Sequence, residues 1–248
     1  MGPENTNVAP AVQTGETVPG AWPGAFGLYK FSKRAVLNNW QTLLAIILLS
    51  FVASFVISMI GGIGSTVDPD TNMVQYGAMY YVMQLVNFLV AIALSVATTV
   101  AELRSVDGKK LSLSESFAPT GKFFVRLLLQ MLLIGLIAIV SFVLLIVPFF
   151  IVMPRLVLAP YFMIDKDMGV MDSIKASWEQ TKGNVGKVYG IFGATLLMML
   201  LMITIIGIPF ALYFLFMYSL AFVVLYRWVG RNQAQAPAGP VAATPVAS

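Results

Sequence analysis

Four polar side chains lie inside long apolar runs, where charged and hydrogen-bonding groups are rare. Arg155 is the one charged residue between residues 127 and 164, Gln130 lies in the same run, and Gln84 and Asn87 lie in the run from 78 to 101. A charge inside a membrane costs about 2.5 kcal/mol or more unless it is paired or hydrated. Gln84 and Asn87 share a helical face and offer carbonyl oxygens. We therefore expect an intramembrane polar cluster of Arg155, Gln84, Asn87 and Gln130.

Two interpretations of this cluster stay open. Its side chains could line a cavity that recognises a lipid phosphate or an anionic solute, because guanidinium groups bind such anions well. They could equally form a structural clamp, since polar contacts between membrane helices commonly hold a bundle together.

The chain contains no Cys and no His. Thiolate nucleophiles, disulfides, His-based acid/base catalysis and the usual zinc ligand sets are therefore excluded. The acidic pairs Asp68/Asp70 and Asp165/Asp167 fall in loops without a nearby base or nucleophile, and turn chemistry explains them. We expect no catalytic site, no metal and no cofactor.

The composition is that of a membrane protein: of 248 residues, 58% are hydrophobic and 10% charged, and the mean hydropathy is +0.85. A helix needs about 20 apolar residues to cross a bilayer. Residues 40–60 and 78–101 each meet this length. We expect an all-α polytopic transmembrane helical bundle of about six spans, arranged as three hairpins with cytoplasmic amphipathic helices.

The other four spans come from two runs that are too long for one helix, residues 127–164 and 188–226. A proline lies near the middle of each, so we divide the first near Val147 and Pro148 and the second at the sequence GIP, Gly207 to Pro209. The alternative is one tilted, proline-kinked helix in place of either hairpin, which gives four or five spans.

Charge placement indicates the orientation, because Lys and Arg are retained on the cytoplasmic side of short loops. With six spans and both termini in the cytoplasm, every basic residue except Arg155 is cytoplasmic, and the outer loops carry Asp68 and Asp70 without a base. We expect a multi-pass protein of the cell (inner) membrane. The cytoplasmic bases are Lys30, Lys33, Arg34, Arg104, Lys109, Lys110, Lys122, Arg126, Lys166, Lys175, Lys182, Lys187, Arg227 and Arg231.

Residues 169–182 have the pattern of a surface helix, with Val170, Ile174 and Trp178 on one face and charged residues on the other. We expect Trp178 at headgroup depth, and Lys175, Lys182 and Lys187 facing anionic lipid. The alternative is an amphipathic connector without a ligand. Residues 25–39 and, less clearly, 111–124 precede the other two hairpins in the same way, which suggests a threefold repeat.

The ends of the chain are rich in Pro, Gly, Ala and small polar residues. We therefore expect a disordered N-terminal tail at 1–24, a membrane domain at 25–231 and a disordered C-terminal tail at 232–248. The basic residues are spread in small groups beside apolar runs, which is not the pattern of a nucleic-acid-binding domain.

Residues 155–184 carry Arg155, the sequence APY at 159–161, an acidic turn and the ending SWEQTKGN. This order resembles the bacterial membrane family named after the glycerophosphoryl diester phosphodiesterase membrane domain. Ser177, Trp178, Thr181, Lys182, Gly183 and Asn184 match the family's motif. The resemblance extends in outline over residues 26–230 and implies a six-helix membrane domain. It does not imply the phosphodiesterase activity, because the catalytic barrel has no counterpart here.

These observations favour a non-enzymatic membrane protein that organises or senses lipids, with anionic headgroups as ligands, or that assists other membrane proteins. One alternative is a transporter or lipid translocator that uses the polar site around Arg155. Another is an accessory membrane subunit of a separate enzyme.

Overall fold

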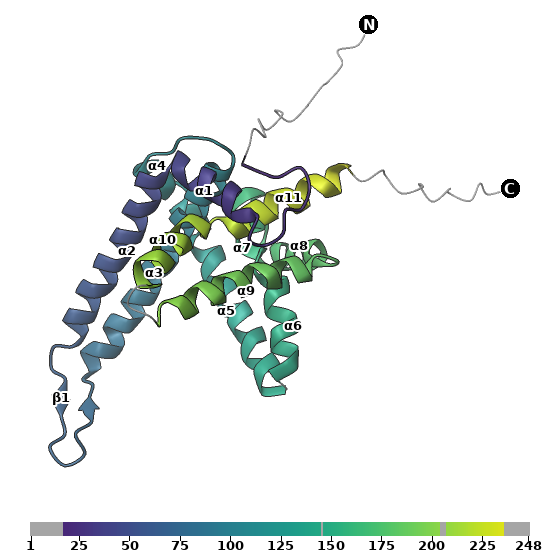
Figure 1. The fold of residues 1–248 in the computed structure, drawn as a ribbon. Coiled ribbons are helices and arrows are strands. Elements are labelled where there is room, and N and C mark those ends of the chain that lie inside the picture. Colours follow the sequence, from purple (N-terminus) through teal and green to yellow (C-terminus); the bar gives the residue numbers. More distant parts are fainter. Residues whose placement is uncertain (1–16, 145, 204–206, 236–248) are drawn as a thin grey trace, which may run out of the picture.

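The computed structural model describes residues 17–144, 146–203 and 207–235. These residues form an all-α bundle with one small β-hairpin (Figure 1). The elements are α1 (Leu28–Asn38), α2 (Trp40–Gly61), β1 (Thr66–Val67), β2 (Val74–Gln75), α3 (Ala78–Val106), α4 (Leu113–Phe117), α5 (Thr120–Leu144), α6 (Ile146–Leu156), α7 (Ala159–Asp165), α8 (Val170–Thr181), α9 (Val185–Leu201), α10 (Gly207–Tyr218) and α11 (Ala221–Gln235).

Helices α2 and α3 form a long hairpin that projects from the rest of the molecule, with β1 and β2 at its tip (Figure 1). In the 22-residue α2 the buried residues are Leu43, Ile46 and Gly61, and most of its other side chains are exposed hydrophobics. A soluble protein does not expose an apolar surface of this extent. The chain is therefore a multi-pass integral membrane protein, as its composition predicts.

Five helical segments of the described chain are long and apolar enough to span a membrane: Trp40–Gly61, Ala78–Val106, Thr120–Val143, Pro148–Asp165 and Gly207–Asn232. Helices α8 and α9 form a sixth candidate together, but they are bent by 93°. The fifth expected span corresponds to α9, which has 17 residues. The three expected hairpins pair α2 with α3, α5 with α6, and α9 with α10.

The two proline turns lie slightly earlier in the chain than expected. Val147 and Pro148 already belong to α6, and Gly207 and Pro209 begin α10, so both prolines occupy a first helical turn. Proline is favoured there because the first N–H groups of a helix have no intrahelical acceptor. Residues 145 and 204–206, which lie between these helices in the chain, are outside the described residues.

The core lies at the end of the bundle that carries α1, α4 and the C-terminus of α3, which we call the basic end. Val36, Val96, Leu127, Val188 and Leu225 are all fully buried there. The break between α10 and α11 also lies in this core. The Ser32 hydroxyl donates to the Met217 carbonyl over 2.7 Å and accepts from the Leu220 N–H over 3.2 Å, so the buried break keeps its backbone groups bonded.

The N-terminal boundary expected at residue 25 is too late. Residues 17–24 pack against the bundle as a strap, because their apolar and polar groups find partners on α3 and α11. The Thr17 hydroxyl donates to the Val106 carbonyl over 2.6 Å, the Arg231 guanidinium donates to the Pro19 carbonyl, and the Trp22 ring lies 5.5 Å from that of Trp228. At the other end, α11 continues to Gln235 instead of stopping at 231. Residues 1–16 and 236–248 of the expected tails lie outside the described chain.

Asn39, between α1 and α2, fixes the loop that follows α3. Its amide nitrogen donates to the Ser105 hydroxyl over 3.1 Å and to the Lys109 carbonyl over 2.7 Å, and its amide oxygen accepts from the Leu111 N–H over 2.9 Å. The side chain is buried, so these backbone groups have little access to water. One amide therefore joins the start of α2 to the end of α3 and to the loop between α3 and α4.

Replacing Asn39 with Ala should lower the free energy of unfolding by about 1–3 kcal/mol, because a buried N–H and a buried carbonyl lose their partner. Thermal unfolding of the detergent-solubilised protein measures the effect. Asn38→Ala is the matched control, since Asn38 is exposed and makes one marginal bond of 3.5 Å. Equal melting temperatures for the two variants would contradict this role of Asn39.

Candidate functional site

The expected polar cluster around Arg155 does not assemble. Arg155 lies in the last turn of α6, and its guanidinium carbon is 4.5 Å from the centre of the Trp178 ring of α8. In the described chain no hydrogen bond joins Arg155 to Gln84, Asn87 or Gln130. The reason is that α6 packs against α5, α8 and α9, whereas Gln84 is exposed on α3 in the hairpin with α2. Arg155 is accommodated by stacking on an aromatic ring, a favourable cation–π arrangement.

Helix α8 makes hydrogen bonds with polar groups of α5 and α6. The Ser177 hydroxyl donates to the Arg155 carbonyl over 2.6 Å, and the Gln130 amide donates to the Ser173 hydroxyl over 2.8 Å. Both serines are fully buried. Gln130 thus contributes to a contact between α5 and α8, as it would in a structural clamp.

The face of α8 that packs against protein is mixed: the buried residues are Ser173, Ile174, Ser177, Gln180 and Thr181. Ile174 packs with Leu156 and Ala159, and Trp178 is half-buried beneath Arg155. On the other face Lys175 is exposed, and Lys182 makes a loose ion pair of 3.9 Å with Glu179. Trp178 is therefore occupied by a protein contact, and the lysines at 175 and 182 are the ones presented outwards.

Lys187 does not belong with these outward lysines. Its ammonium lies 4.9 Å from the Trp228 ring and 5.7 Å from the Trp22 ring, and it donates to the Asn184 side chain. The position of Trp228 at the end of a span suggests an interfacial residue. Its side chain is instead buried in this contact. Sequence spacing could not show this, because the strap that brings Trp22 here lies outside the expected domain.

The most strongly connected charges of the described chain surround Arg227 of α11. Its guanidinium donates to both carboxylate oxygens of Asp165, over 2.6 and 2.9 Å. It also donates to one carboxylate oxygen of Asp107, over 2.8 Å. The three side chains are 22%, 21% and 13% exposed, respectively. The Tyr226 hydroxyl also donates to Asp165 over 2.8 Å. Arg227 therefore ties the C-terminal ends of α3 and α7 to the middle of α11.

Burial raises the pKa of the Asp107 carboxyl, and the charge of Arg227 opposes that shift. The carboxyl of Asp167 behaves in the opposite way: hydrogen bonds from Lys122 and Arg126 lower its pKa, although this group is exposed. The basic end thus holds one enclosed ionic network and one solvent-exposed network.

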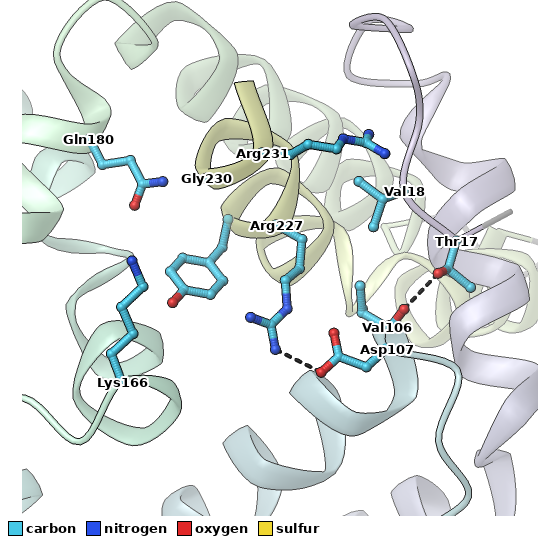
Figure 2. Close-up of a pocket in the computed structure, with 10 residues that line it drawn as sticks. Thr17, Val18, Val106, Asp107, Lys166, Gln180, Arg227, Gly230 and Arg231 are labelled. Atoms are coloured by element: carbon cyan, nitrogen blue, oxygen red, sulfur yellow. Dashed lines mark hydrogen bonds and ion pairs between the residues drawn. The ribbon is translucent and has the colours of Figure 1, made fainter. Parts of the chain in front are cut away.

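A cavity of about 300 Å³ adjoins the enclosed network (Figure 2). Figure 2 shows Lys166 and Gln180 turned toward each other on one side, with the Arg227 to Asp107 contact on the other. Gln180 is 3% exposed, and its amide oxygen has no hydrogen-bond partner among the residues that the structure describes. The lining residues are Thr17, Val18, Val106, Asp107, Lys166, Gln180, Tyr226, Arg227, Gly230 and Arg231.

The sequence does contain a signal for this site, although we did not predict it. Asp107 and Asp165 each follow an apolar helix, and Arg227 precedes the end of another, all on the side expected to be cytoplasmic. Opposite charges at the same depth of neighbouring helices favour an ion pair. What the sequence did not indicate is the strap, which supplies Thr17 and Val18 to the cavity wall.

Within the three described segments, no three His, Cys, Asp or Glu side chains are placed to hold a metal ion. Comparison with protein-family models, with curated proteins and with solved structures gives no match. The resemblance to the phosphodiesterase membrane domain therefore stays a prediction.

Arg227→Met should destabilise the protein by about 3 kcal/mol or more, because two largely enclosed carboxylates lose their counter-ion. The same substitution at Arg126 is the control, since its pair with Asp167 has side chains 42% and 50% exposed and exposed pairs contribute about 0–1 kcal/mol. Thermal unfolding in detergent compares the two variants. An Arg227→Met protein as stable as Arg126→Met would show that the enclosed network does not hold the helices together.

Proposed function

We propose that this integral membrane protein is non-enzymatic and senses or organises anionic lipids, whose phosphate headgroups bind in the cavity between α3, α8 and α11. The observation that carries the proposal is the excess of positive charge around this cavity. Asp107 and Asp165 together exceed the charge of Arg227 by one, whereas Lys166 has no ion-pair partner among the described residues. Arg231 donates to a carbonyl and makes no ion pair within the described chain, so these five groups together carry one net positive charge.

The walls of the cavity support a lipid as the source of the phosphate. Most of the lining is apolar, with Val18 and Val106 beside the bases. The buried amide oxygen of Gln180 offers an acceptor next to Lys166, which suits a hydroxyl beside a phosphate, as in a glycerol headgroup. A free phosphate ion could use the bases and the Gln180 oxygen, but it would gain nothing from the apolar walls.

The proposal includes the orientation that the charges favour, with both termini in the cytoplasm and the protein in the cell membrane. The inner surface of that membrane carries anionic lipid, and each Lys or Arg near it contributes about 1 kcal/mol of attraction. The exposed bases Lys175 and Lys182 of α8 support this placement. The resemblance to the phosphodiesterase membrane domain, proposed on the motif at 177–184, is consistent with a role at a lipid surface.

Lys166→Glu should weaken retention of phosphatidylglycerol roughly 30-fold, because it removes about 1 kcal/mol of attraction and adds a similar repulsion. Native mass spectrometry of the purified protein, titrated with phosphatidylglycerol and with phosphatidylcholine, measures this retention. Lys30→Glu makes the same charge change at an exposed site on α1, away from the cavity, and should retain lipid as the parent protein does.

Inorganic phosphate in excess tests the source of the ligand. If phosphate alone displaces phosphatidylglycerol, the ligand of the cavity is a free anion and not a lipid. Equal retention by the Lys166→Glu and Lys30→Glu variants would show that the cavity is not the lipid site, and would overturn the proposed function.

A further inference from the structure

A second polar site lies inside the membrane-spanning region, between α2, α3 and α7. It is a groove of about 460 Å³, and its lining combines hydroxyl groups with one carboxylate. Ser50 and Ser54 contribute from α2, Ser95, Thr98, Thr99 and Glu102 from α3, and Tyr161 from α7, beside Ala91, Leu94, Val157 and Pro160. The polar residues of α3 recur at helical spacing and therefore share one face.

Glu102 is an intramembrane carboxylate without a basic partner. It lies within the candidate span Ala78–Val106, and its one hydrogen bond comes from the Tyr161 hydroxyl over 3.3 Å. No Lys or Arg is among the residues that line the groove, and no ion pair of the described chain includes Glu102. An acid in this environment is costly to maintain and commonly marks a ligand site or an ion pathway.

The hydroxyl groups of the groove are arranged to accept hydrogen bonds. Ser50 donates to the Ile46 carbonyl over 2.8 Å, Thr98 to the Leu94 carbonyl over 2.8 Å and Thr99 to the Ser95 carbonyl over 2.9 Å. Each hydrogen is thereby engaged within its own helix, and the oxygen lone pairs stay available. Acceptors beside an unpaired carboxylate fit a ligand that brings both N–H donors and positive charge.

We propose that this groove binds a primary ammonium group, with Glu102 as its counter-ion and the Ser and Thr hydroxyls as acceptors. The acceptors extend along α3 from Ser95 to Glu102, roughly 10 Å of helix, so they form a row and not the compact shell that a dehydrated metal ion requires. A quaternary ammonium has no N–H to donate and prefers a cage of aromatic rings, of which the lining offers Tyr161 alone.

Two sources can supply this ammonium: the headgroup of an aminophospholipid or a free amine. The groove borders α2, whose buried residues are few, so it lies beside the lipid-exposed part of the bundle. Glu102 is about one turn from the end of α3, near the depth of headgroups at the basic end. The site is separate from the cavity at Lys166 and has the opposite charge preference.

Native mass spectrometry of the purified protein with phosphatidylethanolamine and phosphatidylcholine tests the assignment. We expect selective retention of phosphatidylethanolamine that falls about tenfold or more in Glu102→Gln, which removes the charge but keeps the shape. Glu115→Gln is the control, because Glu115 is an exposed capping residue of α4. Thr98→Val should also weaken retention of phosphatidylethanolamine, although it leaves Glu102 in place. This variant tests the site if Glu102→Gln fails to fold.

Competition with free ethylammonium separates the two sources. If it displaces nothing, and phosphatidylethanolamine retention depends on Glu102, the ligand is the lipid. If ethylammonium itself binds in a Glu102-dependent manner without any lipid preference, the ligand is a free amine. The proposed ammonium site is wrong if phosphatidylcholine is retained as well as phosphatidylethanolamine. It is also wrong if retention of phosphatidylethanolamine is unchanged in both Glu102→Gln and Thr98→Val. The Lys166→Glu variant should leave phosphatidylethanolamine retention unchanged, so the two sites fail or succeed independently.

Discussion

The basic end of the protein depends on the pairing of Arg227 with Asp107 and Asp165. Most surfaces of this chain face lipid and contribute little to holding the helices together, because lipid tails are as apolar as the side chains that they contact. Directed polar contacts must then fix the arrangement. A bidentate guanidinium supplies both geometry and charge, and here it joins the ends of α3 and α7 to the middle of α11. The cavity exists because these ends are held side by side.

The sequence predicts α2 almost to the residue, since an uninterrupted apolar run fixes both of its ends, whereas α3 continues to Val106, past the expected end at 101. It also predicts α8, whose end at Gly183 has the positive φ of 78° that glycine favours. The sequence does not predict the partner of Arg155, because the depth of a residue in a membrane does not determine which helix packs beside it. The cluster was assigned to α3 from depth alone, whereas the connection through α7 places α8 against Arg155. The strap was missed because a segment rich in Pro and Gly can pack when two tryptophans, Trp22 and Trp228, meet.

The two proposed sites differ in charge. One is a cationic cavity in the loops and helix ends of the basic end, and the other is an acidic groove within the spans. The rings of Tyr161 and Tyr226 lie 5.9 Å apart between them: Tyr161 bonds Glu102 of the groove, and Tyr226 bonds Asp165 beside the cavity. A lipid bilayer that contains both anionic and amine headgroups presents ligands for each site at the same surface.

The break between α6 and α7 affects how the chain enters the membrane. The carbonyl of Arg155 lies in the last turn of α6, where a helix provides no donor, and the hydroxyl that bonds it belongs to Ser177, 22 residues further along the chain. Until that residue has been synthesised and α8 has docked, the segment exposes an unpaired carbonyl and a guanidinium to hydrocarbon. The polar groups at the end of α6 are therefore satisfied only when α8, a later segment of the chain, packs against them.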